Sequence, residues 1–169
     1  MKKFIYFSML LLVTSIFTSA TTFADDPVKQ NKISKKEQKT NAIKEMIDTR
    51  DYTFIARTAL PMTMPSKQLT GEYYLKISKD TIEAYLPYYG RAYTAPINEE
   101  GGIKFTSTDF TYKAEESKKG WDINIETKDV SRHSYELSLF VSKSGMVSLQ
   151  VNDSSRQSIS FNGNIDMKE

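Results

Sequence analysis

The sequence predicts a mainly β protein, an antiparallel meander closed into a β-barrel of eight to ten strands, with one helix on its N-terminal side. Three observations indicate this fold. Apolar and polar residues alternate along about nine short segments after Arg50, turn-forming residues separate these segments, and no second stretch has helical spacing. A chain of 169 residues, of which 39% are hydrophobic and 26% charged, has the composition of one globular domain.

The first 24 residues are typical of a secretory signal peptide. Lys2 and Lys3 form a positive start, residues 4–17 are almost entirely apolar, and residues 22–24 offer a small-x-small cleavage site. We therefore expect cleavage before Asp25 and an exported protein, either periplasmic or secreted. An uncleaved membrane anchor is the alternative, although the apolar stretch is short for a span of about 20 residues.

We expect the mature chain to be electrically neutral. The whole chain has 23 basic and 21 acidic residues, and the loss of Lys2 and Lys3 makes these numbers equal. A neutral chain has no general attraction to nucleic acid, so we expect no nucleic-acid partner. The chain has no cysteine and hence no disulfide, and no later apolar segment is long enough to span a membrane.

Two segments precede the β-domain. Residues 25–34 are polar and contain Pro27, so we expect a flexible leader. Residues 35–48 have helical spacing, with Ser34 as the expected N-cap, and their apolar residues lie on one narrow face. We expect this helix to be a plug or strap on the β-domain, and a partner-binding helix is the alternative. The apolar residues are Ala42, Ile43, Met46 and Ile47.

Residues 49–169 form the predicted barrel domain. Short connections such as Lys143-Ser144-Gly145 favour antiparallel neighbours, and closure removes exposed strand edges. A two-layer sandwich of the same strands is the alternative fold. Trp121 has the same parity as Ile123 and Ile125, so it should point into the core. The predicted strands are at residues 52–59, 73–78, 81–86, 103–105, 110–112, 121–125, 135–141, 147–151 and 159–161.

Residue types that carry common catalytic chemistry are scarce. The single histidine, His133, is expected at an exposed strand start, and no G-x-S-x-G or phosphate-binding glycine motif is present. The adjacent acidic pairs at 99–100 and 115–116 are typical of solubilising turns. We therefore predict no catalytic residue, no metal site, no cofactor and no enzymatic activity. A hydrolase built on distant carboxylates is the third alternative for function.

Tyrosine density is the unusual feature of this chain. Six of its ten tyrosines lie between residues 73 and 93, close to Arg91, and tyrosine suits binding surfaces because it joins an apolar ring to a polar tip. Alternatively, these rings plug one end of a barrel, and Arg91 anchors their turn through hydrogen bonds or ring stacking. The candidate ligand-binding residues are Tyr85, Tyr88, Tyr89, Arg91, Tyr93 and Trp121.

The tyrosine-rich segment also carries a family resemblance. The run Leu86-Pro87-Tyr88-Tyr89-Gly90-Arg91-Ala92-Tyr93, with supporting matches at 52–54, 102–105 and 155–160, resembles secreted proteins of Bacteroidetes-type bacteria. That family is known as domain of unknown function 4251. The likeness extends over roughly residues 48–165. It implies export and a lipocalin-like β-barrel, and it brings no established activity, ligand or catalytic residue.

Two functions fit these observations. The first is a non-catalytic, envelope-associated barrel that holds a small amphipathic ligand in a mouth lined by the candidate residues. The second is an interaction or scaffold domain with a filled barrel, whose tyrosine-rich loop and N-terminal helix meet an envelope protein. Most predicted strands offer large inward residues, which favours a filled interior, and small ones such as Ala56 and Ala84 are few.

Overall fold

The computed structural model describes residues 27–93, 101–130 and 134–167. The predicted signal peptide, the first two residues of the predicted leader, the pair at 99–100 and His133 lie outside the described residues. The elements are α1 (Pro27–Thr49), β1 (Tyr52–Pro61), β2 (Lys67–Gln68), β3 (Tyr74–Ile77), β4 (Ile82–Leu86), β5 (Ile103–Ser107), β6 (Phe110–Glu116), β7 (Gly120–Thr127), β8 (Tyr135–Ser142), β9 (Met146–Asp153) and β10 (Arg156–Ile165).

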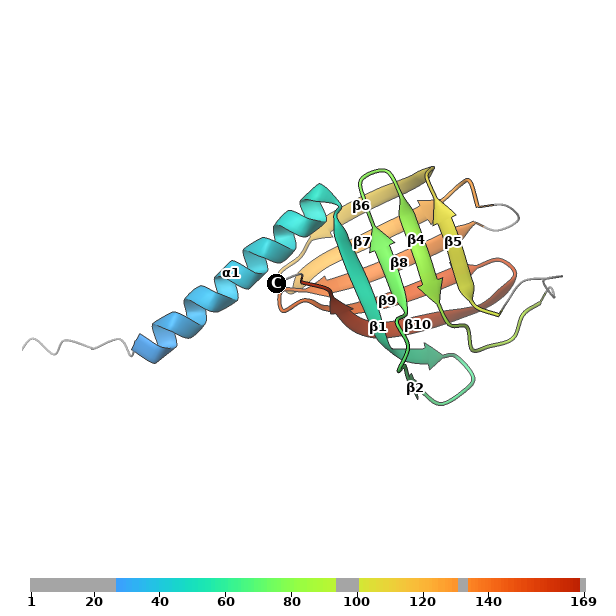
Figure 1. Cartoon of the computed structure of the whole chain (residues 1–169), viewed down its shortest axis with the longest axis horizontal. Coiled ribbons are helices and arrows are strands. Elements are labelled where there is room, and N and C mark those ends of the chain that lie inside the picture. The colour runs from blue at the N-terminus through green and yellow to red at the C-terminus, as the bar shows by residue number, and fades with distance from the viewer. Residues whose placement is uncertain (1–26, 94–100, 131–133, 168–169) are drawn as a thin grey trace, which may run out of the picture.

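One antiparallel sheet forms the β-domain. Its strand order is β5-β4-β3-β1-β10-β9-β8-β7-β6. The short strand β2 is outside this order and pairs with β1. The sheet curls into a nearly closed barrel, with β5 and β6 as its two edges (Figure 1). The predicted barrel is therefore confirmed, and the alternative sandwich is wrong. Strand β2 was not predicted, because two exposed residues show no alternation.

The connection between the two edge strands is held by Asp129. Its carboxylate accepts hydrogen bonds from the Ser107 hydroxyl, from the Thr108 amide at 2.7 Å and hydroxyl at 3.1 Å, and from the Asp109 amide at 3.0 Å. These bonds lower the pKa of Asp129 because they favour its charged form, and the bond from the Ser107 hydroxyl has the largest effect. Asp129 thereby fixes the turn that leads from β5 into β6.

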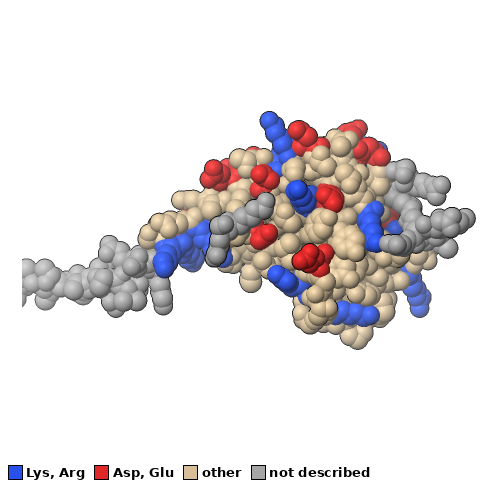
Figure 2. All heavy atoms as spheres, viewed as in Figure 1, with Lys and Arg blue, Asp and Glu red and all other residues tan. Residues whose placement is uncertain are grey.

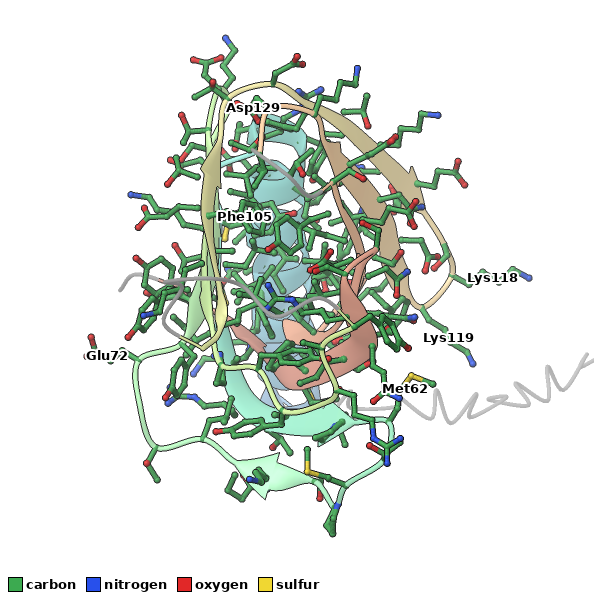
Figure 3. The ribbon with its side chains drawn as sticks, turned by 90° about the vertical axis from the view of Figure 1, so that its right-hand side faces the viewer. Met62, Glu72, Phe105, Lys118, Lys119 and Asp129 are labelled. Carbon is green, nitrogen blue, oxygen red and sulfur yellow. The ribbon has the colours of Figure 1, made fainter. Side chains whose placement is uncertain are left out.

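Alternate side chains of the strands face inward and form one hydrophobic core. Phe54 and Phe161 are fully buried, and Trp121 is 2% exposed, so the predicted inward position of Trp121 is confirmed. Figure 3 shows side chains filling the space that the strands enclose. The barrel is thus a packed core rather than a hollow one in the part of the chain that the structure describes.

The helix is longer than the sequence predicted. It begins at Pro27 rather than at residue 35, so residues 27–34 are helical where the sequence predicted a leader, and Ser34 lies inside the helix instead of capping it. Proline is well tolerated at the first helical position, and no later proline or glycine interrupts α1. Among the described residues, no helix is apolar enough over sufficient length to cross a membrane.

The C-terminal half of α1 packs against one end of the barrel. Ile43 and Ile47 are 0% and 1% exposed and belong to the core. The Thr40 hydroxyl donates to the Lys143 carbonyl at 3.3 Å, and Lys44 pairs with Glu116 at 2.8 Å. The predicted packing of this helix on the β-domain is therefore confirmed. Residues 34–39 are exposed where α1 extends away from the barrel (Figure 1).

The barrel has two chemically different ends. The helix end carries α1 and the β6–β7 and β8–β9 turns. The loop end carries residues 87–93 and the β9–β10 turn, since the Tyr93 amide donates to the Ser155 carbonyl at 2.8 Å. Strand β9 connects the two ends, and its eight residues span about 25 Å at a rise of about 3.3 Å per residue.

Candidate functional site

The candidate residues do not line a single opening of the barrel. Trp121 is the second residue of β7 and pairs with Val141, next to the β8–β9 turn at the helix end. The tyrosines after residue 85 lie at the loop end. The inward-facing strand residues between them are buried, so a single ligand cannot contact Trp121 and these tyrosines inside the barrel.

Tyr85 lies on the outer face of the barrel. It is 40% exposed, and its ring stacks on Tyr73 at a centroid distance of 5.8 Å and tilts against Tyr74 at 5.9 Å. The Tyr74 hydroxyl donates to Glu83 at 2.6 Å, which raises the pKa of Tyr74. Lys104 Nζ lies 5.1 Å from the centre of the Tyr85 ring. These contacts make an outer aromatic cluster that is separate from the barrel interior.

Tyr88 fastens the tyrosine-rich segment to the barrel. Its hydroxyl lies 2.9 Å from the Arg91 carbonyl and 3.1 Å from the Gln157 carbonyl, both of which can accept its hydrogen. The guanidinium of Arg156 lies 5.1 Å from the centre of the Tyr88 ring. Burial raises the pKa of Tyr88, and the positive charge of Arg156 opposes this shift. Residues 88–91 are therefore held to the start of β10.

The arginine that organises the loop end is Arg156, not Arg91. Arg156 Nε lies 2.8 Å from Asp153 Oδ2, and Arg156 Nη1 donates to the Gly102 carbonyl at 2.8 Å. Both side chains of the ion pair are buried, at 9% and 2% exposure. Arg91 is exposed, and among the described residues only its backbone makes hydrogen bonds. The expectation that the Arg91 side chain anchors the turn by hydrogen bonds or stacking is thus not met.

Sequence reasoning missed this buried ion pair. The signal was present, because Asp153 is followed by two serines and then Arg156, a pattern typical of a tight turn. Asp153 accepts from the Ser155 amide at 2.9 Å and from its hydroxyl at 2.8 Å. The sequence could not reveal that the turn is buried, because the segment that covers it, around Gly102, is distant from the turn in the chain.

An exposed surface lies around the remaining candidates at the loop end. Lys67 Nζ lies 4.2 Å from the centre of the Tyr89 ring, which brings the chain after β1 beside the tyrosine-rich segment. Tyr93 is 70% exposed, Met62 72% and Met64 39%. We call these residues, together with the exposed Arg91, the tyrosine surface. It consists of Met62, Met64, Lys67, Tyr89, Arg91 and Tyr93.

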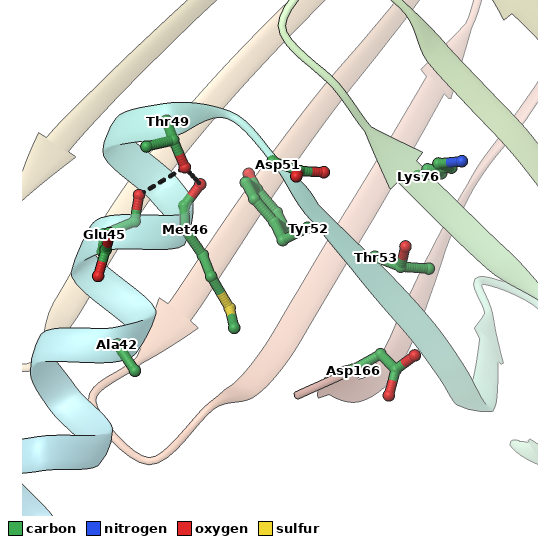
Figure 4. A pocket seen from close by; sticks show the side chains of 9 residues that line it. All are labelled: Ala42, Glu45, Met46, Thr49, Asp51, Tyr52, Thr53, Lys76 and Asp166. Carbon is green, nitrogen blue, oxygen red and sulfur yellow. Dashed lines mark hydrogen bonds between the residues drawn. The ribbon is translucent and has the colours of Figure 1, made fainter. Parts of the chain in front are cut away.

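A groove of about 340 Å³ lies elsewhere, between α1 and the outer face of β1 (Figure 4). Glu45, Asp51 and Asp166 contribute three carboxylates to its lining, together with Lys76. Sites for small organic molecules are usually lined mainly by apolar and aromatic side chains. Three carboxylates in so small a groove set it apart from such sites, and none of the candidate residues lines it.

The part of the chain that the structure describes contains no candidate metal site. No group of three or more His, Cys, Asp or Glu side chains is arranged to hold an ion there. The Asp129 carboxylate has its oxygens occupied by the turn that it fixes. We therefore place the candidate site on the tyrosine surface.

Comparison with known proteins identifies the family. The family model for a domain of unknown function, DUF4251, matches residues 34–165. The chain belongs to the DUF4251 family. It is also similar to the crystal structure of a DUF4251 family protein from Bacteroides eggerthii DSM 20697, with a TM-score of 0.60 and 11% identity over 75% of this chain and 86% of that chain. This likeness concerns the fold of the DUF4251 domain. No curated protein matches the chain.

Proposed function

We propose that this DUF4251 protein is an exported, non-catalytic binding domain that engages a protein partner through the tyrosine surface. The observation that carries the proposal is the exposure of Tyr93, at the end of a segment that Tyr88 holds in place, and of Met62, which follows Pro61 where β1 pairs with Ile159 of β10. Large apolar side chains exposed together at one end of a domain are characteristic of interaction sites.

The composition of the tyrosine surface supports a protein partner. Aromatic residues, methionine and arginine are enriched in protein interfaces, and the surface combines all three. Methionine adapts its shape to irregular partners because its side chain is unbranched and flexible. Lys67 and Arg91 favour a partner that presents carboxylates around an apolar centre.

A small ligand in the barrel mouth is the weaker alternative. The inward side chains fill the barrel, and the candidate tyrosines divide between its outer face and its loop end. A ligand would have to displace core residues such as Phe54 or Phe161, each of which is fully buried. Removing such contacts costs several kcal/mol per side chain, about 3–5 for a phenylalanine.

Site-specific photocrosslinking in the native host tests the proposal. Tyr93 and Met62 are each replaced by photoreactive benzoylphenylalanine, and Met146 serves as the matched control. Met146 is 66% exposed but lies at the start of β9, at the helix end. We expect Tyr93 and Met62 to give the same discrete crosslinked protein and Met146 to give none.

Affinity measurements with that purified partner complete the test. Tyr93→Ser and Met62→Ser should each weaken binding about tenfold or more, as central interface residues do, while Met146→Ser should not. Crosslinks that are equal at all three positions, or a partner whose affinity is unchanged by both variants, would contradict the proposal.

A further inference from the structure

Five lysines gather at the helix end of the barrel. Lys36 and Lys39 lie on α1, Lys118 and Lys119 lie in the β6–β7 turn, and Lys143 lies in the β8–β9 turn. Four of these side chains are exposed, and Lys143 is half-buried. We call these five residues the lysine cluster. Figure 2 shows basic side chains collected on α1 where it leaves the barrel.

Tertiary contacts bring the three segments together. The Lys143 amide donates to the Lys119 carbonyl at 3.3 Å, so the two turns are adjacent. The Thr40 hydroxyl bonds the Lys143 carbonyl, which seats α1 on the β8–β9 turn. Gly145 has a φ of 85°, a left-handed conformation that favours glycine, and Lys39 Cε lies 3.7 Å from the place that a Cβ there would take. The cluster therefore depends on the fold and not on one run of lysines.

The charge of the cluster is only partly neutralised. Among the described residues, no carboxylate oxygen lies within 4.0 Å of these five ammonium groups. Glu116 pairs with Lys44 at 2.8 Å and also attracts Lys143 through its charge. Glu37 lines a cleft of about 520 Å³ together with Lys36 and Lys143 and offsets one charge. The five lysines outnumber the two carboxylates that lie against them, Glu37 and Glu116, so the cluster itself keeps an excess of positive charge.

This excess charge acts locally even though the mature chain is expected to be neutral. Charges in physiological salt are screened over about 8–10 Å, whereas the two ends of the barrel are about 25 Å apart by the length of β9. A surface that approaches the helix end therefore meets the lysine cluster and not the average charge of the protein.

We propose that the lysine cluster binds the anionic phospholipid headgroups of a membrane surface and so directs the tyrosine surface away from the bilayer. The proposal rests on the export proposed above. Before cleavage, nine residues separate the apolar residues 4–17 from α1, so the helix end is the part of the domain that follows the membrane-directed segment in the chain. The cluster contains lysines only, and compact flexible ammonium groups suit a field of phosphates without the fixed geometry or ring stacking of nucleic-acid sites.

Vesicle binding by the exported protein, purified in the form that cells accumulate, tests this proposal. Vesicles of phosphatidylcholine with about 30% phosphatidylglycerol should bind the protein at low salt, and binding should fall steeply as salt rises. Pure phosphatidylcholine vesicles should not bind it. Each lysine near an anionic surface contributes about fivefold to partitioning, so the triple variant Lys36→Gln, Lys39→Gln, Lys119→Gln should lose about 100-fold.

A matched variant separates the cluster from net charge. Arg57→Gln, Lys104→Gln, Lys128→Gln removes the same number of exposed charges away from α1 and the two lysine-bearing turns, and should bind as the parent does. Equal losses in the two variants, equal binding to neutral vesicles, or tighter binding to DNA than to vesicles would each overturn the proposal. The assay contains no protein partner, so its outcome is independent of the crosslinking test of the tyrosine surface.

Discussion

The Tyr52 hydroxyl lies 3.2 Å from the Tyr112 hydroxyl, and this pair joins β1 to β6, two strands that are not neighbours in the sheet. The Tyr112 hydroxyl also donates to the Ile47 carbonyl at 3.4 Å, so the pair connects the helix to both strands. Tyr52 is 4% exposed, and burial, with Tyr112 nearby, raises its pKa well above the ordinary value of 10.0. The neutral form of Tyr52 is therefore part of the folded state.

We predict that Tyr52→Phe lowers the free energy of unfolding at pH 7 by about 1 kcal/mol, because it removes one buried hydrogen bond. Urea denaturation measures this change. The control Tyr93→Phe, at an exposed hydroxyl, should stay within about 0.5 kcal/mol of the parent. An equal effect of the two variants would show that the Tyr52–Tyr112 contact contributes nothing to stability.

The same residue predicts an alkaline limit to stability. Unfolded Tyr52 ionises near its ordinary pKa of 10.0, whereas the folded group keeps its proton to higher pH. This stabilisation is therefore complete below about pH 10 and is lost as the pH rises toward the folded pKa. Tyr52→Phe should make the free energy of unfolding fall less steeply above pH 10, which denaturant titrations at several pH values measure.

Trp121→Ala should destabilise the protein strongly. Replacing a buried tryptophan by alanine costs about 3–5 kcal/mol, because it leaves a cavity as well as losing apolar burial. Trp121→Phe should cost less, since it keeps most of the ring and removes the buried Nε1, which has no hydrogen-bond partner among the described residues. Thermal melting measures both. A Trp121→Ala protein that melts within a few degrees of the parent would contradict the core position.

Arg156→Lys should reduce stability much more than Arg91→Lys. Lysine cannot reach Asp153 and the Gly102 carbonyl together in the arrangement of the Arg156 guanidinium, so we expect a loss of about 1–3 kcal/mol. Arg91 is exposed, so its replacement should change stability by no more than about 0.5 kcal/mol. Denaturant unfolding of both variants measures the two losses in stability. A larger loss for Arg91→Lys than for Arg156→Lys would show that Arg91 anchors the turn.

Asp129 predicts a loss of stability in acid. Its hydrogen bonds lower its pKa in the folded state below the ordinary 3.8, so its contribution is present above about pH 4 and is lost as the pH falls through the folded pKa. Asp129→Asn should lower the melting temperature at pH 7 and weaken the dependence of melting on pH below 4. Asp122→Asn, at an exposed position on β7, is the control and should melt as the parent does.

Export predicts a mature protein that begins at Asp25. The intact mass of the protein recovered from the periplasm or the medium measures this start directly. A recovered protein that still contains residues 1–24 would contradict the signal-peptide prediction and would favour the membrane anchor instead.

The sequence by itself determined the all-β class, the number and spacing of most strands, and the inward position of Trp121. Alternation of apolar and polar residues has a direct physical cause in the strand geometry, which places successive side chains on opposite faces. The apolar stripe of α1 likewise indicated that the helix packs on the barrel, because an exposed stripe of that kind is unfavourable in water. The start of the helix was less predictable, since Pro27 is compatible both with a leader and with a first turn.

Only the tertiary structure decided where the tyrosines and the charges meet. Tyr85 and Tyr88 are three residues apart in the chain, yet one lies on the outer face of β4 and the other lies against the start of β10. The Asp153–Arg156 pair is buried by a segment some fifty residues away in the sequence, and the lysine cluster joins three segments. Such contacts depend on how the sheet curls and how α1 is seated, and local patterns carry no information about those long-range arrangements.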